Sequence, residues 1–271
     1  MTPRPLRKRW AWATCPRRSE ALARITAVAN QKGGVAKTTS TLALGCATAE
    51  MGRRTLVVDM DPQAALTYSM GVDPDALRET VNDVLVRRLP IREVIAHREV
   101  DLVPANIDLA GAEAILLTKT GREYALQRAL RDVEGEYDRI FIDCPPSLGI
   151  LTINALTAAE EVVIPLQCEA LSHRGVGQLI ETLEDIRHFT NPDLRVSGVI
   201  PTMYDGRTKH AREVLQDVGG RYGVTVFEPP VKKSIRFAEA TRAGRSIISF
   251  APNHPGADAY RAMARSLEES R

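Results

Sequence analysis

Short apolar runs alternate with helix-like stretches along the chain from Ile25 onward. The runs are rich in Val and Ile and mostly lack polar alternation, which is typical of strands buried on both faces. They predict strands over residues 25–29, 55–59, 100–104, 139–143, 161–165, 195–201 and 225–227. Helices are expected over residues 38–51, 122–133, 148–158, 173–189, 209–222 and 255–268. This alternation predicts an α/β fold: a doubly wound, mostly parallel sheet with helices on both faces.

The first 24 residues do not share this pattern. They contain seven basic residues and one acidic residue, are interrupted by Pro3, Pro5 and Pro16, and show no helical period. No apolar stretch of the length found in a secretory signal follows the basic residues. We therefore expect a basic, flexible tail over residues 1–24 and a single folded domain over residues 25–271. Contact of the tail with DNA, contact with anionic lipid, and an upstream start codon that adds no function all stay open.

Composition narrows the class of protein. Hydrophobic residues make up 44% of the 271 residues and charged residues 26%, as in an average globular chain. No window approaches the roughly 18 apolar residues that a membrane span needs. The four cysteines form no CxxC pair, which argues against a structural zinc site, a thioredoxin motif or a disulfide framework. Free thiols fit a reducing cytoplasm.

The net charge of +2 conceals a second basic segment. Residues 195–245 carry ten Lys or Arg and five Asp or Glu. Such a segment can contact a polyanion, and it can equally be solvated surface.

A glycine-rich stretch directly follows the first predicted strand, with the sequence N-Q-K-G-G-V-A-K-T-T over residues 30–39. A turn of this kind between a strand and a helix directs backbone N–H groups and a helix N-terminus at one point, which binds phosphate. Lys37 would reach the β- and γ-phosphates, and the Thr38 hydroxyl would bind Mg²⁺. The pattern is K-G-G-x-x-K-[ST], with a second lysine, Lys32, five residues upstream of Lys37.

Acidic residues end two other predicted strands. Asp59 and Asp61 lie at i and i+2 at the end of an extended segment, so both point the same way. Ligands bind at this edge of open α/β sheets, which places Asp61 to orient a water attacking the γ-phosphate. Asp143 ends the apolar run over residues 139–142, the Walker B form, and would hold Mg²⁺. Cys144 beside it has no metal partner and is interpreted as a small buried residue.

These segments together resemble the deviant Walker A ATPases of the ParA/MinD class: the loop at 30–39, D-x-D-P-Q at 59–63 and D-x-P-P-S at 143–147. P-L-Q-C-E at 165–169 is similar to the ParA/Soj branch. The resemblance implies a P-loop ATPase domain with catalytic residues Lys32, Lys37 and Asp61. It implies that Lys32 crosses a dimer interface to the partner's nucleotide and that Asp61 positions the catalytic water. The nucleotide-binding residues would be Lys32, Gly33, Gly34, Val35, Ala36, Lys37, Thr38 and Thr39, with Thr38 and Asp143 as metal ligands.

Two alanines depart from the family pattern. Ala36 stands where glycine is commoner, and we expect a negative φ there, so that its methyl group avoids the phosphates. Ala64 stands where the family often has glycine, which predicts a stiffer switch segment. Asp59 is expected to be a supporting acid near the loop lysines.

The late segment over residues 232–240 resembles the part of the family that contacts DNA. The matching DNA-binding candidates are Arg236 and Arg207, and phosphate contacts of this kind would be independent of DNA sequence. Pro230 and Ser234 lie near where the family closes over the adenine.

The resemblance implies a cytoplasmic, nucleoid-associated DNA-partition ATPase with ATP and Mg²⁺ as cofactors. Its ATP-bound homodimer would bind DNA non-specifically and be reset by hydrolysis that a ParB/Spo0J-type centromere-binding protein stimulates, with no membrane partner. The alternative is a MinD-like positioning switch at a membrane surface. Residues 259–271 resemble the final helix of a globular domain rather than a lipid-binding helix, which argues against that alternative, whereas the basic tail with Trp10 and Trp12 keeps it open.

Overall fold

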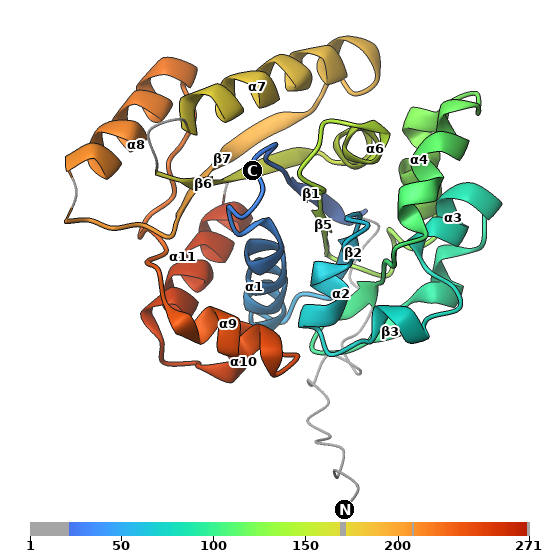
Figure 1. The fold of residues 1–271 in the computed structure, drawn as a ribbon, viewed down its shortest axis with the longest axis horizontal. Coiled ribbons are helices and arrows are strands. Elements are labelled where there is room, and N and C mark those ends of the chain that lie inside the picture. The colour runs from blue at the N-terminus through green and yellow to red at the C-terminus, as the bar shows by residue number, and fades with distance from the viewer. Residues whose placement is uncertain (1–21, 169–171, 208, 270–271) are drawn as a thin grey trace, which may run out of the picture.

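The computed structural model describes residues 22–168, 172–207 and 209–269 (Figure 1). Its strands are β1 (Arg24–Val28), β2 (Thr55–Asp59), β3 (Ala96–His97), β4 (Asp101–Val103), β5 (Arg139–Asp143), β6 (Glu161–Gln167) and β7 (Arg195–Thr202). Its α-helices are α1 (Lys37–Glu50), α2 (Ala65–Ser69), α3 (Val81–Arg87), α4 (Leu109–Leu117), α5 (Ala125–Leu130), α6 (Ile150–Ala158), α7 (Ser172–Phe189), α8 (Lys209–Tyr222), α9 (Ile235–Arg242), α10 (Ile247–Phe250) and α11 (Pro255–Glu269).

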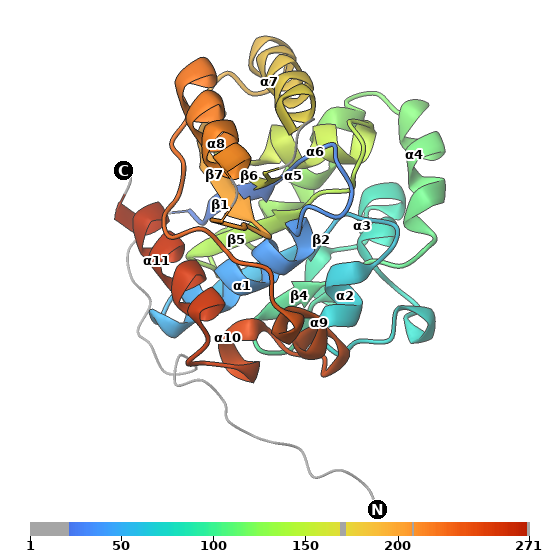
Figure 2. The ribbon, with the colours of Figure 1, turned by 60° about the vertical axis from the view of Figure 1, so that its left-hand side comes forward.

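The described strands form one seven-stranded sheet in the order β3-β4-β2-β5-β1-β6-β7. All neighbouring pairs are parallel except β3 with β4, which is antiparallel. Helices lie on both sides of this sheet (Figures 1 and 2). The predicted doubly wound, mostly parallel α/β fold is confirmed.

Successive residues of the central strands enter two separate cores, one on each face of the sheet. In β2, Leu56 and Val58 pack in the core covered by α3 to α8, whereas Val57 between them packs in the core covered by α1, α2, α10 and α11. In β5, Ile140 and Phe141 divide in the same way. Burial on both faces explains why these strands are almost continuously apolar.

The sequence misplaced some strands. Residues 225–227 were predicted as a strand, but they make a single bridge, Val199 to Val226. The ladder stops there because Pro229 and Pro230 follow at once and lack the N–H groups needed to continue it. The short antiparallel β3 was not predicted, since two residues carry no periodic signal.

Short helices were also missed. The sequence predicted neither α2, α3 and α4 nor α9 and α10, and residues 122–133 form a 3₁₀ turn (Arg122–Tyr124) followed by the shorter α5. Most of the missed helices are too short for a hydrophobic period to stand out. For α3 a local signal existed, because Thr80 and Asp83 form a capping box. Residues 1–21 of the expected tail lie outside the described residues, and Arg24 already belongs to β1.

Helix α11 is held against α1 by one buried face. Its buried residues are Gly256, Ala257, Ala259, Tyr260, Met263, Ala264 and Leu267. Tyr260 is fully buried, and its hydroxyl lies 2.9 Å from Ser40 Oγ of α1. The apolar face of α11 is therefore packed inside the domain, as expected for a final helix of a globular domain. Within the described residues, no helix combines the length and apolar character required to cross a membrane.

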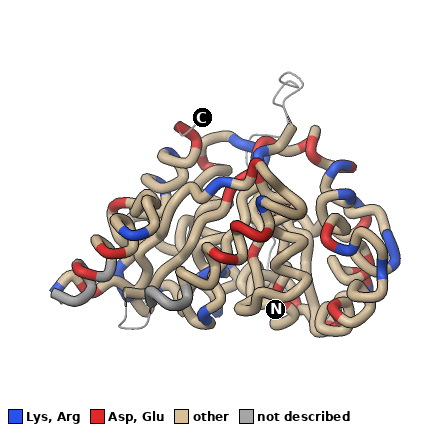
Figure 3. Tube along the Cα trace, turned by 90° about the horizontal axis from the view of Figure 1, so that it is seen from above, with Lys and Arg blue, Asp and Glu red and all other residues tan. Residues whose placement is uncertain are grey.

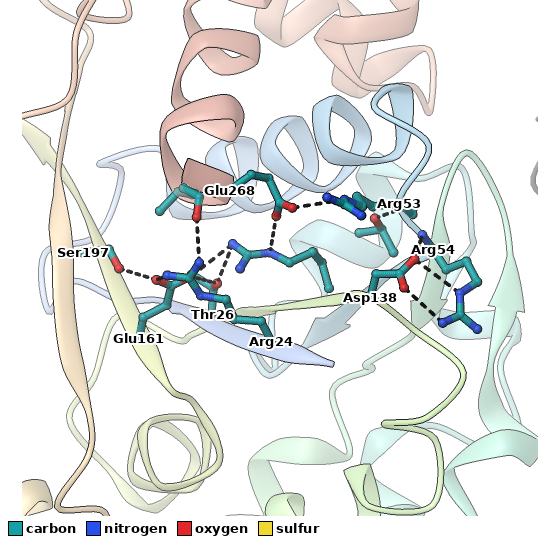
Figure 4. Close-up of polar contacts among 11 residues, drawn as sticks. Arg24, Thr26, Arg53, Arg54, Asp138, Glu161, Ser197 and Glu268 are labelled. Carbon is teal, nitrogen blue, oxygen red and sulfur yellow. Dashed lines mark hydrogen bonds and ion pairs between the residues drawn. The ribbon is translucent and has the colours of Figure 1, made fainter. Parts of the chain in front are cut away.

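A buried cluster of charges ties α11 to the amino-terminal ends of the strands (Figure 4). Glu161 at the start of β6 is fully buried and accepts hydrogen bonds from Arg24 (2.5 Å) and Arg139 (3.1 Å). Arg24 also donates to the Leu267 carbonyl of α11, and Arg139 Nε lies 3.2 Å from Glu268 Oε1. The first residues of β1, β5 and β6 are thereby joined to the last turn of α11.

The environment of Glu161 favours its charged form. Burial by itself raises the pKa of this carboxyl, but the charge of Arg139, hydrogen bonds from Ser197 and Thr26, and the charge of Arg24 outweigh it. The pKa therefore lies below its ordinary value of 4.5. This lowered pKa stabilises the folded protein above pH 4.5, and the stabilisation is lost as the pH falls through the folded pKa.

We expect Glu161→Gln to lower the free energy of unfolding by about 3–5 kcal/mol, because the buried guanidinium group of Arg139 and the partly buried one of Arg24 lose a compensating charge. As the pH falls below 4.5, the free energy of unfolding should decrease less in the variant than in the wild type. Urea unfolding between pH 3 and 7 measures both effects. Glu239→Gln, which breaks the exposed pair with Arg236, is the matched control and should cost less than about 1 kcal/mol. Equal effects of the two variants would contradict a role for the buried cluster.

Candidate nucleotide site

The phosphate loop connects β1, in the middle of the sheet, to α1, which begins at Lys37. Two side chains fasten the loop to the neighbouring strands. Asn30 accepts a hydrogen bond from the Lys32 backbone N–H (3.0 Å) and donates to the Pro165 carbonyl of β6 (2.7 Å). The Thr202 hydroxyl at the end of β7 donates to the Val35 carbonyl (3.0 Å). The loop thus has a fixed shape at the carboxyl edge of the sheet, where ligands bind in this class of fold.

Lys37, Thr38 and Asp143 come together beneath this loop. The Thr38 hydroxyl donates to Asp143 Oδ2 (2.7 Å), and Thr41, one turn further along α1, donates to Asp143 Oδ1 (3.3 Å). The Lys37 ammonium group is buried and donates to the Lys32 carbonyl (3.2 Å). The predicted Walker A and Walker B residues therefore occupy one site, although more than 100 residues separate them.

The negative charge of Asp143 is only partly compensated by its surroundings. Burial, together with the neighbouring Asp59, raises the pKa of Asp143 well above its ordinary value. Burial also lowers the pKa of Lys37, an effect that Asp143 opposes. Among the described residues, no ion pair within 4 Å involves Asp143. A cation beside the Thr38 hydroxyl would supply the missing positive charge.

These residues fit Mg²⁺ rather than a metal held by protein ligands alone. In the part of the chain that the structure describes, no group of three or more His, Cys, Asp or Glu residues is arranged to hold a metal ion. Mg²⁺ prefers oxygen ligands and is usually bound through one or two protein groups with waters and substrate phosphates. The Thr38 hydroxyl and the Asp143 carboxylate are such oxygen donors.

The two acids after β2 have different surroundings. Asp59 is fully buried and accepts hydrogen bonds from the Asp61 N–H, the Thr67 N–H and the Thr67 hydroxyl. Burial raises the pKa of Asp59 to about 6. Its bonds fasten α2 to the end of β2, so Asp59 is an anchor of α2, and its charge also acts on Asp143. Asp61 is close enough to Lys37 to act on its charge and keeps a small exposed surface.

The backbone at Ala36 differs from the expectation. Ala36 has φ 68° and ψ 32°, the left-handed conformation, and not the expected negative φ. Its carbonyl accepts the Ser40 N–H, so the residue forms the N-cap of α1 and the loop geometry dictates its conformation. Ala64, the N-cap of α2, is also left-handed, with φ 52°. Glycine adopts this conformation without the steric cost that a Cβ atom brings.

A cavity of about 210 Å³ opens beside the phosphate loop. Its lining residues come from the loop and α1, the end of β7, the segment before α9, α9 itself and α11: Ala36, Thr39, Thr202, Met203, Val231, Lys232, Lys233, Ser234, Phe237, Ala238 and Tyr260. Ser234 lines the cavity, whereas Pro230 is not among its lining residues. Ser234 also caps α9 by accepting the Arg236 N–H, and its hydroxyl lies 3.1 Å from His254 Nε2.

The two predicted DNA contacts lie on exposed surface. Arg236, in the first turn of α9, pairs with Glu239 (2.7 Å) and lies over the Phe250 ring at 5.3 Å. Arg207, in the loop after β7, pairs with Asp205 (2.7 Å). Cys144 is buried as predicted, and burial raises the pKa of its thiol.

The sequence reasoning missed several residues of the site. Thr41 could have been found from its i+3 spacing to Thr38, which places both hydroxyls on one side of α1. Asn30, directly after β1, could have been found as a polar residue at a strand end. Thr202 and Tyr260 gave no local signal, because β7 and α11 meet the loop only in the folded chain.

Comparisons with known proteins agree with this geometry. A family model described as "AAA domain" matches residues 23–196. The chromosome partitioning protein ParA of Myxococcus xanthus is 41% identical over 94% of this chain and 89% of its own length. The sporulation initiation inhibitor protein Soj of Bacillus subtilis is 41% identical over 91% of this chain and 98% of its own length.

A solved structure is similar over almost the whole fold. The crystal structure of "Cobyrinic Acid a,c-diamide synthase" from Mycobacterium smegmatis, with bound ADP and magnesium, has 48% identity and a TM-score of 0.82. The match covers 92% of this chain and 97% of that one. The chain is similar to ParA and Soj over nine-tenths of its length, and the geometry of the phosphate loop supports the same family assignment. The chain therefore belongs to the ParA/Soj family, within the ParA/MinD class of P-loop ATPases.

Proposed function

We propose that this protein is a DNA-partition ATPase of the ParA/Soj type. The observation that carries the proposal is the convergence of Lys37, the Thr38–Asp143 pair and Asp61 at the mouth of the phosphate loop. Hydrolysis needs a cationic group for the phosphates, oxygen donors for the metal and an acid that orients water, and these residues supply all three. ATP and Mg²⁺ are the cofactors, in keeping with the nucleotide and magnesium in the Mycobacterium smegmatis structures.

Each residue has a distinct part in the proposed reaction. Lys37 would bind the β- and γ-phosphates, and Thr38 with Asp143 would hold the metal ion, which when bound neutralises phosphate charge. Asp61 would accept a hydrogen bond from the attacking water and so orient it. Lys32 is exposed on the loop, which suits a side chain that reaches the nucleotide of a second copy across a dimer interface.

The contact between α2 and α9 supports coupling of hydrolysis to DNA binding. The turn after α9 meets the turn after α2, and a Cβ built on Gly244 would lie 2.7 Å from Gly71 Cα. α2 begins four residues after Asp61, and α9 carries both Arg236 and part of the cavity lining. A displacement of the segment from Asp61 through α2 would therefore also displace α9, which carries Arg236. The reason is that the backbones at Gly71 and Gly244 are in close contact.

The ATP-bound homodimer would bind DNA without sequence preference through Arg236 and Arg207. A ParB/Spo0J-type protein would stimulate hydrolysis and reset the dimer, with the protein acting in the cytoplasm at the nucleoid. The packed face of α11 argues against the MinD-like alternative at a membrane, since that face is covered by α1.

Ala36→Gly should raise the free energy of unfolding by about 1 kcal/mol, because glycine relieves the left-handed strain at the N-cap of α1. Thermal or urea unfolding without nucleotide measures this. Ala43→Gly, a buried position inside the same helix, should change stability in the opposite direction by a similar amount. A loss of stability in Ala36→Gly would contradict the left-handed conformation.

Asp61→Asn should bind ATP nearly as well as wild type but hydrolyse it about 100-fold more slowly, because a neutral amide oxygen is a weaker acceptor than a carboxylate and cannot take a proton from the water. Single-turnover rates and nucleotide titration separate the two steps, and dimers should accumulate with ATP. Asp59→Asn is the matched control: it should lower thermal stability by weakening the anchor of α2. A hydrolysis rate within about threefold of wild type would remove Asp61 from the mechanism.

Arg236→Glu should weaken DNA binding while leaving ATP binding and dimer formation intact. The slope of log affinity against log salt should flatten by about two units per dimer, one for each lost phosphate contact. Glu239→Gln should strengthen DNA binding, because it releases Arg236 from its present ion pair. The measurement is DNA affinity over a salt series with ATP, using two unrelated duplexes. An unchanged slope, or a loss confined to one duplex, would contradict the assignment.

A further inference from the structure

A groove of about 390 Å³ lies between α3, α4 and α5, and we call it the α3–α5 groove. None of the phosphate-loop residues and none of the acids at the nucleotide site line it. Its floor is apolar: Val84 and Leu85 of α3, Leu116 of α4 and Ala125 of α5 are all buried or nearly so. The volume lies within the range of sites that bind ligands, roughly 300–1,000 Å³.

The rim of the groove is strongly basic. It carries Arg88, Lys119, Arg122 and Arg128 against a single acid, Asp132. Figure 3 shows several Lys and Arg positions, with Asp and Glu positions among them, at the end of the molecule that holds α3 and α4, on its right-hand side. An apolar floor inside a cationic rim favours an occupant that combines apolar and acidic side chains.

The rim cations divide into two kinds. Lys119 donates to the Val86 carbonyl, and Arg122 donates to the Leu117 carbonyl (2.7 Å) and to Glu123 (2.9 Å). These two charges are therefore held at the ends of α3 and α4. Within the described residues, the guanidinium groups of Arg88 and Arg128 have no hydrogen-bond or ion-pair partner, and both residues are exposed. They are the two rim charges available to a bound acid.

The backbone fixes the position of Arg88 at the end of α3. Arg88 ends α3 in the left-handed conformation, with φ 59°, where glycine is the usual residue. A side chain here costs about 1–2 kcal/mol compared with a relaxed backbone. The left-handed residue ends α3, because it lets the Leu89 N–H bond to the Asp83 carbonyl (3.2 Å), so the Arg88 side chain starts from a fixed backbone at the rim.

We propose that the α3–α5 groove binds an acidic segment of a partner protein, with apolar side chains on the floor and carboxylates against Arg88 and Arg128. The basic tail of this chain is excluded as the occupant, because residues 1–24 carry seven basic residues and one acidic residue. Single-stranded nucleic acid is disfavoured because the lining has no aromatic side chain on which a base could stack, and duplex DNA held through its phosphates would leave the apolar floor uncovered. The proposal is independent of the proposed ATPase activity.

The test starts from a random peptide display library panned on the full-length protein and on the double variant Arg88→Glu/Arg128→Glu. Both positions are exposed, so the double variant should fold. Peptides enriched on the wild type and absent from the double variant should be rich in Asp and Glu together with Leu, Ile or Phe. Their affinities, measured by fluorescence anisotropy, should fall at least tenfold in the double variant.

Two further variants make the test specific. Thr120→Trp should block the groove and reduce peptide affinity, because Thr120 is exposed on its lining and a large side chain there fills space. Arg78→Glu, an exposed arginine outside the lining, should leave affinity unchanged. Enriched peptides without net negative charge, equal binding to the double variant, or a charge reversal that lowers only DNA affinity would each overturn the proposal.

Discussion

The register of the central parallel strands is the constraint on which the site depends. β5 pairs with β1 and β2 so that Val28 and Asp59 both lie level with Asp143. This alignment brings the start of the phosphate loop, the metal-binding acid and the anchor of α2 to one edge. A slip by one residue would turn every side chain of a strand to the other face, and each face has its own core. The two cores therefore fix the geometry of the site.

A buried acid at the amino ends of the parallel strands and one at their carboxyl ends have opposite electrostatic surroundings. At their amino ends Glu161 is surrounded by Arg24, Arg139, Thr26 and Ser197, so its charge is compensated and its pKa is low. At their carboxyl ends Asp143 is equally buried but has only hydroxyl donors and a nearby lysine, so its pKa is high. The cluster around Glu161, in which the charges are paired, stabilises the fold. Asp143, whose charge has no ion-pair partner among the described residues, is able to bind a cation. The amino ends of the strands therefore contribute to stability, and the carboxyl ends form the candidate site.

The nucleotide cavity and the DNA candidate share one helix. α9 lines the cavity, carries Arg236 and is fixed at its start by Ser234 and at its end by the contact of Gly244 with Gly71. Ala36 and Ala64 hold left-handed conformations at the N-caps of α1 and α2, on either side of Asp61 in the site. Strain of this kind persists where the surrounding structure dictates the backbone, and it is often found at functional sites. The α3–α5 groove lies on different helices, so a partner there need not compete with nucleotide or DNA.

The amino-acid sequence alone is sufficient to predict the fold class, most of the long elements, and the order of the loop, Asp61 and Asp143. These signals are local: apolar runs, a glycine-rich turn and acids at strand ends can be recognised without knowing what packs against them. Three features become apparent only in the folded chain: Asp59 anchors α2, Ala36 is left-handed, and Thr202 and Tyr260 complete the site. Short helices such as α9, and the approach of Gly71 to Gly244, depend on contacts between segments far apart in the chain. The free energy of those contacts comes from packing in the folded domain, so it cannot be predicted from a single stretch of sequence.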